Sequence, residues 1–276
     1  MSDIGALPAI ETPLRRDFWL DLGDLGRRGA GLVVPPAVAA TLLLGGWELL
    51  SRGGFLSARL LPAPSKIFDT LVRSLGVLME QAQPTFWGAL AGILCAAALG
   101  IALGLAVSYS RTLMDAVYPT IVVFQLIPKV ALAPVFLLWF GTGFAANVIF
   151  SVFIAFFPVV VATITGLQAA PPNYERLCRS LMMSRLRMFL TVKFPFALPH
   201  IFSGLRIGVT FAVIGVVLGE FITAQTGLGY IILFAANNFE TALLLAGILL
   251  LCGVGIVLFV FFLALETIVY RAYDSR

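Results

Sequence analysis

Charged side chains are scarce in this chain of 276 residues, at 12% of the total, which is about half the usual share in a soluble domain. Hydrophobic residues make up 60%, and the mean hydropathy is +1.02. A soluble fold of this size cannot bury so much apolar surface. The composition therefore excludes an ordinary soluble enzyme and a disordered chain, and it predicts an all-α integral membrane protein.

Residues that often carry chemistry are scarce as well. The single histidine, His200, excludes a multi-histidine metal site, and the three cysteines have no paired spacing. None of the three lysines follows a glycine, so the Gly-Lys-Ser/Thr loop that holds nucleotide phosphates is missing. We therefore expect no metal, no cofactor and no ATP hydrolysis in this chain. The net charge of +4 could suggest nucleic acid, but in so apolar a chain it favours basic loops facing the cytoplasm.

Long apolar stretches predict six membrane-spanning helices, because about 20 apolar residues cross the hydrocarbon. The predicted spans are 29–47, 81–110, 113–138, 146–167, 199–223 and 241–265. If both ends are cytoplasmic, twelve basic residues lie in inner segments and four in outer ones, which favours that orientation. Residues 1–28 are then a cytoplasmic tail with Phe18, Trp19 and Leu22 as membrane anchors, and residues 29–276 form the membrane domain.

Residues 64–80 predict an amphipathic helix on the outer side rather than a span. Apolar residues recur there at helical spacing, and charged ones lie elsewhere. The apolar stripe comprises Phe68, Leu71, Val72, Leu75 and Met79. Such a helix serves either as an interfacial anchor or as a docking ledge for an external partner.

The cytoplasmic loop 168–199 predicts a second amphipathic helix, which begins after Pro171 and Pro172. Its apolar stripe follows the pattern i, i+3, i+4, i+7 and i+8 and comprises Tyr174, Leu177, Cys178, Leu181 and Met182. Three charged residues lie off the stripe, namely Glu175, Arg176 and Arg179. A short helix of this kind lies on lipid or inserts into a groove of a partner.

Polar residues inside predicted spans are expensive and usually face a cavity or a partner. Lys129 follows the helix-breaking Pro128, and Gln125 lies one turn before it. Both side chains suit a polar pathway for an anion. Alternatively, Lys129 binds the backbone carbonyls that lose their helical partners at the break. Glu220 is predicted to line an outer gate, to contact an external binding protein, or to lie at a solvated helix end. Arg206 is expected to extend toward the cytoplasm, and Asn147 to lie at the interface.

The loop from Arg179 to Ile207 resembles the signature loop of ABC importer permeases. It reads Arg-Ser-Leu-Met-Met-Ser-Arg from Arg179 and then Val-Lys-Phe-Pro-Phe-Ala-Leu-Pro-His from Val192. Three further segments agree with the branch that moves nitrate, sulfonates, taurine, bicarbonate and pyrimidine vitamin precursors. They are Leu-Pro-Ala-Pro-Ser at 61–65, Ile-Pro-Lys-Val-Ala-Leu-Ala-Pro at 127–134 with Leu-Trp-Phe-Gly at 138–141, and Gly-Glu at 219–220 with Gly-Leu-Gly-Tyr at 227–230. The resemblance covers about residues 30–270.

The sequence departs from the family's signature at four positions. The acidic position of the motif corresponds to Arg176, its two alanines to Leu177 and Cys178, and its glycine to Met182. Glycine permits a tight turn between two short helices, and methionine is a flexible apolar filler.

The resemblance implies a type I ABC importer permease of the bacterial inner membrane. It implies a homodimer of permeases, two cytoplasmic ATPase subunits that bind ATP and Mg²⁺, and an extracytoplasmic binding protein. The residues 174–182 would couple the ATPase to the membrane helices, and the solute would be a small anion or a pyrimidine-type precursor. The alternative is a secondary transporter or channel that works without an ATPase; an intramembrane enzyme would need a nucleophile and base, which the sequence does not offer.

Overall fold

The computed structural model describes residues 17–54, 57, 60–223 and 225–274, with the side chains of 17–34, 137, 223 and 273–274 left aside. The chain forms two compact units, Met1–Ser65 and Lys66–Arg276, and each is treated by itself. All regular elements in the described ranges are helical, as the sequence predicts.

The first unit is dominated by the helix α1, Asp17–Arg52. Its last turn binds the segment that follows, because Glu48 accepts hydrogen bonds from the backbone and hydroxyl of Ser65, at 3.1 and 2.7 Å. Arg52 adds a salt bridge to Glu48 at 2.6 Å. The helix runs without interruption past residue 28, where the tail is predicted to end. The predicted anchors of the tail lie outside the described side chains.

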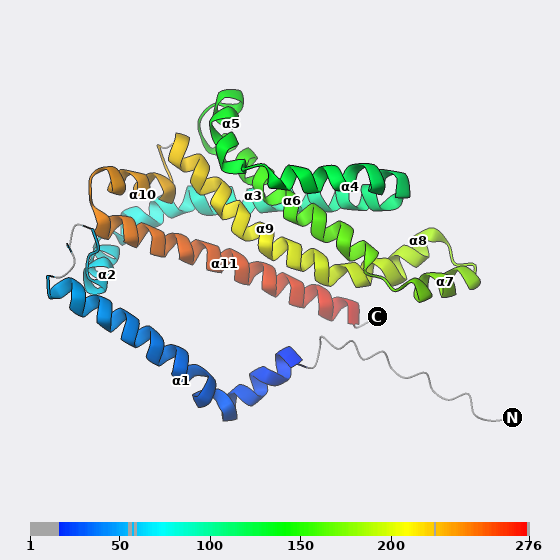
Figure 1. Cartoon of the computed structure of the whole chain (residues 1–276), viewed down its shortest axis with the longest axis horizontal. Helices are drawn as coiled ribbons and strands as arrows, with labels where there is room; N and C mark the ends of the chain where they lie inside the picture. Colours follow the sequence, from blue (N-terminus) through cyan, green and yellow to red (C-terminus); the bar gives the residue numbers. More distant parts are fainter. Residues whose placement is uncertain (1–16, 55–56, 58–59, 224, 275–276) are drawn as a thin grey trace. The chain divides into compact units, whose positions relative to one another are not determined.

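The second unit contains twelve elements in its described residues, counting the helix that crosses the boundary. They are α2 (Pro64–Arg73), α3 (Leu75–Tyr109), α4 (Arg111–Leu126), η1 (Lys129–Leu132), α5 (Ala133–Phe140), α6 (Phe144–Gln168), α7 (Pro172–Ser180), α8 (Arg185–Met188), η2 (Phe189–Lys193), α9 (Phe194–Thr223), α10 (Leu228–Asn237) and α11 (Thr241–Asp274). Figure 1 shows α7 and α8 at one end of the long helices and α10 at the opposite end.

Four stretches of the described residues are long and apolar enough to cross a membrane. They are Leu75–Tyr109, Phe144–Gln168, Arg185–Ile222 and Thr241–Ala272. A fifth span results if α4 and the η1–α5 segment are counted together, and this pair is bent by 83°. The third predicted span is therefore broken rather than straight, because Pro128 cannot continue the helix. The predicted total of six depends on residues 29–47, part of which lies outside the described side chains.

The prediction of one surface helix over residues 64–80 is wrong for its second half. α2 ends at Arg73, and a new helix begins at Leu75, so the residues from Leu75 to Glu80 form the first turns of the long α3. The apolar stripe also lies on the surface of the unit, with Phe68 65% exposed. Ile67, outside the predicted stripe, is the buried residue of α2.

The helix α6 packs closely between α3 and α9, because both neighbours present small residues to it. On α3, a Cβ added at Gly100 would lie 2.9 Å from the Cγ1 of Val159. On α9, a Cβ added at Gly215 would lie 2.6 Å from the backbone Cα of Ser151. The Ser151 hydroxyl also donates to a carbonyl of α9, that of Ala212, at 2.9 Å. Small residues at such crossings let helix backbones approach within a membrane, so these three helices form the rigid core of the unit.

Candidate functional site

One side of α7 is fixed to the base of α9. Cys178 is buried in an apolar cluster with Ala170 and Val192. The ring of Tyr174, one turn before Cys178, lies 5.6 Å from the ring of Phe196. Because both residues point toward the protein, this side of α7 is occupied by the chain's own residues.

Exposed apolar residues lie in the second half of α7 and just beyond its end, next to the anchored residues. We call them the outer apolar face, which comprises Leu177, Leu181 and Met182, and their exposed fractions are 56%, 66% and 94%. The five residues of the predicted stripe therefore differ in burial. Tyr174 and Cys178 are covered by residues that flank α7, whereas the outer apolar face is open.

Met182 forms the turn that ends α7. Its φ is +50°, the left-handed conformation that non-glycine residues rarely adopt. The amide of Met182 donates to the Arg179 carbonyl at 3.0 Å, and that of Met183 donates to the Cys178 carbonyl at 2.9 Å. This is the hydrogen-bond pattern of a helix ending in which the left-handed residue is usually glycine. The position where the resemblance places a glycine therefore keeps the glycine-type turn with methionine, and it carries the most exposed residue of the outer apolar face.

Glu175 connects α7 to the segment that leads into α9. Its carboxylate lies 3.0 Å from the ammonium of Lys193 and 3.8 Å from the guanidinium of Arg179. Arg176 and Arg179 are exposed. The sequence places all three charged residues off the apolar stripe, but it does not indicate that Glu175 binds across the loop.

Lys129 lies just after the break between α4 and η1. Its ammonium donates to the backbone carbonyl of Gln125 at 3.1 Å and lies 5.0 Å above the ring of Phe157. This carbonyl lies in the last turn before the break. The contact agrees with the second of the two interpretations, in which Lys129 binds a backbone carbonyl at the break. The side chain of Lys129 is half-buried, and so is that of Gln125.

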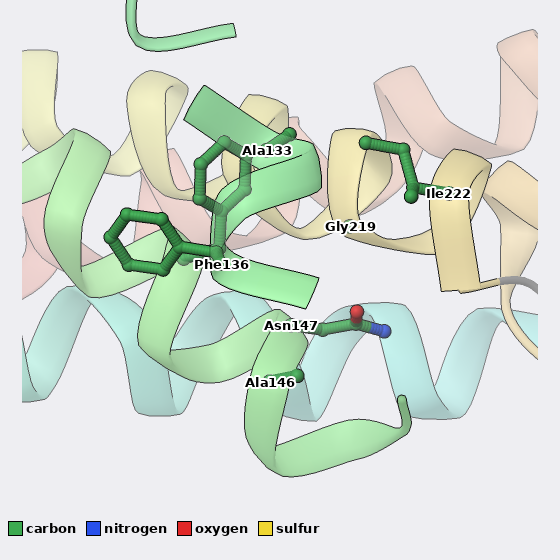
Figure 2. Close-up of a pocket in the computed structure, with 7 residues that line it drawn as sticks. Ala133, Phe136, Ala146, Asn147, Gly219 and Ile222 are labelled. Carbon is green, nitrogen blue, oxygen red and sulfur yellow. The ribbon is translucent and has the colours of Figure 1, made fainter. Parts of the chain in front are cut away.

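A small hollow lies beside this region, between α5, α6 and α9 (Figure 2). Its lining comprises Ala133, Phe136, Ala146, Asn147, Phe150, Gly219 and Ile222. Asn147 lies near the start of α6, as the sequence predicts, and is only 8% exposed. A Cβ added at Gly219 would lie 2.6 Å from the Oδ1 of Asn147, which shows how closely the amide packs on α9.

Arg206, which the sequence predicts to extend toward the cytoplasm, has an ionic partner on α11. Its guanidinium lies 3.7 Å from the carboxylate of Glu266 on α11, which is 14% exposed. The pair joins α9 to α11 within the apolar region. Ionic partners inside a span are expected, but the sequence alone does not identify which carboxylate Arg206 meets.

Glu220 is buried at the end of α9 near α10, with 1% of its surface exposed. Its carboxylate accepts hydrogen bonds from the Thr85 hydroxyl and from the Gly229 amide, both at 2.8 Å. Sequence reasoning missed Thr85 and Gln81, which bind the amides of Leu228 and Gly227 at this end of the unit. The available signal was two polar residues one turn apart in an apolar stretch, which place both on one face of α3.

No group of three or more histidine, cysteine, aspartate or glutamate residues that could hold a metal occurs within the described ranges. His200 is exposed on α9, and of the described cysteines only Cys178 is buried.

Comparison with known proteins identifies relatives for most of the chain. Residues 88–275 match the family described as binding-protein-dependent transport system inner membrane component. The chain is 33% identical over 227 residues to a probable ABC transporter permease protein of Haemophilus influenzae, covering 82% of this chain and 93% of the relative. It is 33% identical over 234 residues to the formylaminopyrimidine transport permease protein of Halalkalibacterium halodurans, covering 84% and 93%. It is 31% identical over 245 residues to a nitrate import permease protein of Leptolyngbya laminosa, covering 86% and 88%.

Proposed function

Because this chain belongs to the family of binding-protein-dependent transport system inner membrane components, we propose that it forms half of the membrane pathway of an ATP-driven importer. Membership makes it an ABC importer permease, a multi-pass protein of the bacterial inner membrane, and a transport protein rather than an enzyme. The proposal adds its partners, its orientation and the class of its solute.

The observation that carries the proposal is that α7 is anchored to the unit and still exposes apolar residues. Tyr174 and Cys178 hold the helix to Phe196 and Val192, and the outer apolar face is left on the surface. A short anchored helix with exposed apolar residues is suited to a groove in a partner protein. We assign that groove to a cytoplasmic ATPase subunit, which binds ATP and Mg²⁺ and supplies the phosphate loop that this chain lacks.

The orientation that we propose has both ends and the α7–α8 loop in the cytoplasm. Five basic residues lie from α7 to the start of α9, namely Arg176, Arg179, Arg185, Arg187 and Lys193. The end of the unit that carries α10 lies opposite and faces the extracytoplasmic binding protein (Figure 1). Basic loops are retained on the cytoplasmic side, which supports this assignment. Residues 29–47 of α1 then add the sixth span, and a second copy of the chain completes the pathway.

The solute that we propose is small and polar, either an anion or a pyrimidine-type precursor. Lys129 carries a positive charge at the break of the third span, and the Gln125 carbonyl takes one of the three hydrogens of its ammonium. The remaining hydrogens suit an anionic group. Relatives named for nitrate and for formylaminopyrimidine transport support both solute classes.

The proposed docking is tested by placing a charge on the outer apolar face with Leu181→Asp. An unpaired charge buried against an apolar groove costs several kcal/mol, on the order of 3–5, which is enough to cancel the contribution of a short helix. We expect the variant to insert in the membrane and to lose the ATPase subunit on co-purification. The matched control is Ser184→Asp, because Ser184 caps α8 by accepting from the Arg187 amide at 3.3 Å and aspartate caps equally well.

The control separates the apolar face from the charge of the loop. If Leu181→Asp retains the ATPase, α7 is not the docking element and the lipid-anchor interpretation holds. If both variants lose the ATPase, the charge of the loop and not the outer apolar face decides binding, and the proposal fails. If the wild-type chain imports its solute in vesicles with no ATPase present, the secondary-transporter alternative replaces it.

A further inference from the structure

The start of α10 is held by side chains from two other helices. The amides of Gly227, Leu228 and Gly229 donate, respectively, to the Oε1 of Gln81 at 2.7 Å, the hydroxyl of Thr85 at 2.9 Å and the carboxylate of Glu220 at 2.8 Å. The Thr85 hydroxyl in turn donates to Glu220 at 2.8 Å. We call this arrangement the α10 clasp; it consists of the side chains of Gln81, Thr85 and Glu220 and the amides of 227–229.

The backbone of this turn fits only because glycine occupies two positions. Gly227 has a φ of +106°, and any Cβ there would collide with the Glu220 carboxylate. A Cβ at Gly229 would lie 2.8 Å from the Cβ of Glu220 and 3.0 Å from the Val217 carbonyl. The close approach of the turn to α9 therefore depends on the absence of side chains.

Glu220 meets no ionic partner among the described residues, although it is 1% exposed. A buried carboxylate without a cation is costly unless hydrogen bonds and dipoles compensate. The N-terminus of a helix carries roughly half a positive charge, together with amides that lack partners in the helix. Glu220 thus supplies an internal acceptor for the start of α10.

We propose that Glu220 is a positioning residue, and that the α10 clasp fixes the outer helix α10 to α3 and α9 so that the permease presents a preformed surface to its external binding protein. The clasp itself is independent of the proposed function, whereas the role of the surface rests on that function. The clasp also assigns Glu220 a structural role in place of the predicted role in an outer gate, because its carboxylate binds the Thr85 hydroxyl and the Gly229 amide within the unit.

The surface that the clasp would position is the turn between α10 and α11. Phe239 is 80% exposed there and has a φ of +57°, and its neighbours Asn238 and Glu240 are exposed as well. The Glu240 amide donates to the Ala235 carbonyl at 2.8 Å, so the turn is rigidly continued from α10. An exposed aromatic residue with polar neighbours is a typical anchor in a protein interface.

The clasp is tested with Thr85→Val, which keeps the shape of the side chain and removes both hydrogen bonds of the hydroxyl. Thr85→Ser, which keeps the hydroxyl, is the matched control. In the assembled transporter, hydrogen–deuterium exchange of residues 227–231 should become faster in Thr85→Val by on the order of tenfold, and it should be unchanged in Thr85→Ser. This measurement needs no transport activity.

The second measurement follows ATP hydrolysis by the assembled transporter in liposomes as the binding protein is added. We expect Thr85→Val to keep the basal rate and to need several-fold more binding protein for half-maximal stimulation, with Thr85→Ser close to wild type. A residue with a merely structural role in the membrane domain would lower the basal and the stimulated rate together.

The outcomes distinguish the two halves of the inference. Unchanged exchange at 227–231 in Thr85→Val overturns the α10 clasp. Faster exchange with an unchanged requirement for the binding protein overturns the surface role of α10. If the wild-type transporter shows no stimulation by any binding protein, the proposed function fails, and the exchange result still decides the clasp.

Discussion

The carboxylate of Glu175 lies 3.0 Å from the ammonium of Lys193, on the opposite branch of the loop between α6 and α9. The pair connects α7 directly to the last residue of η2, from which α9 continues. Since α9 has 30 residues, it extends about 45 Å from this point toward α10. Under the proposed function, we therefore expect a displacement of α7 by its partner to reach α9 partly through this pair.

We predict that Lys193→Glu, which places two carboxylates together, lowers the amount of solute imported per ATP hydrolysed. Both side chains are a little over a quarter exposed, so the pair contributes little more than about 1 kcal/mol, and the expected loss is two- to fivefold. The charge-swapped double variant Glu175→Lys/Lys193→Glu restores the contact and should recover most of the loss. Uptake and ATP hydrolysis measured on the same vesicles give this ratio, and an equal loss in the single and the swapped variant would show that the pair has no coupling role.

We predict that Gly215→Ala destabilises the protein by about 1–3 kcal/mol, because the new methyl group meets the backbone of α6. Gly253→Ala is the control, since a Cβ at Gly253 has no neighbour within 4 Å. Alanine is the better helix former, so the control should be neutral or slightly stabilising. Thermal unfolding in detergent can be followed by a thiol-reactive dye at the buried Cys178, with Cys95 and Cys252 replaced. Equal midpoints for both variants would contradict the close packing of α6 and α9.

We predict that a cysteine introduced at Asn238 reacts with a membrane-impermeant reagent from outside, and that one introduced at Ser184 reacts only after the membrane is opened. Both positions are exposed in the structure, so a difference in labelling reports the side of the membrane. The reason is the excess of basic residues around α7 and α8. Labelling of the Ser184 site in intact cells would reverse the orientation.

The positions of the long helices could be predicted because hydrophobic length is a local property of the sequence. The fourth predicted span, 146–167, and the helix α6 differ by at most two residues at either end. The break at Pro128 was also predictable, since proline lacks the amide and clashes with the preceding turn. The boundary at Ser74 was not, because the helical periodicity of 64–80 continues through it and only the packing of α3 ends the surface helix there.

The sequence predicts that a polar residue within a span has a partner, but it does not predict which residue that partner is. A charge in an apolar helix needs a partner, so Arg206 and Glu220 were sound candidates. Their partners, Glu266 and Thr85, are 60 and 135 residues away, and no local pattern specifies such pairs. The covered and exposed residues of α7 could not be distinguished for the same reason. Periodicity defines a stripe, and only contacts outside the helix, such as those with Val192 and Phe196, decide which part of the stripe is covered.

The bend between α4 and η1 has a consequence for how the protein enters the membrane during synthesis. α4 has 16 residues and is about 24 Å long, less than the roughly 30 Å of the hydrocarbon, and the segment from η1 to α5 is shorter still. Neither piece is a complete signal for insertion, and the carbonyl groups around Pro128 need covering within the bilayer. The ring of Phe136 on α5 already packs 4.8 Å from that of Phe153 on α6. We therefore expect the segment from α4 to α5 to enter the bilayer only after α6 has been synthesised. These elements would then insert together rather than one helix at a time.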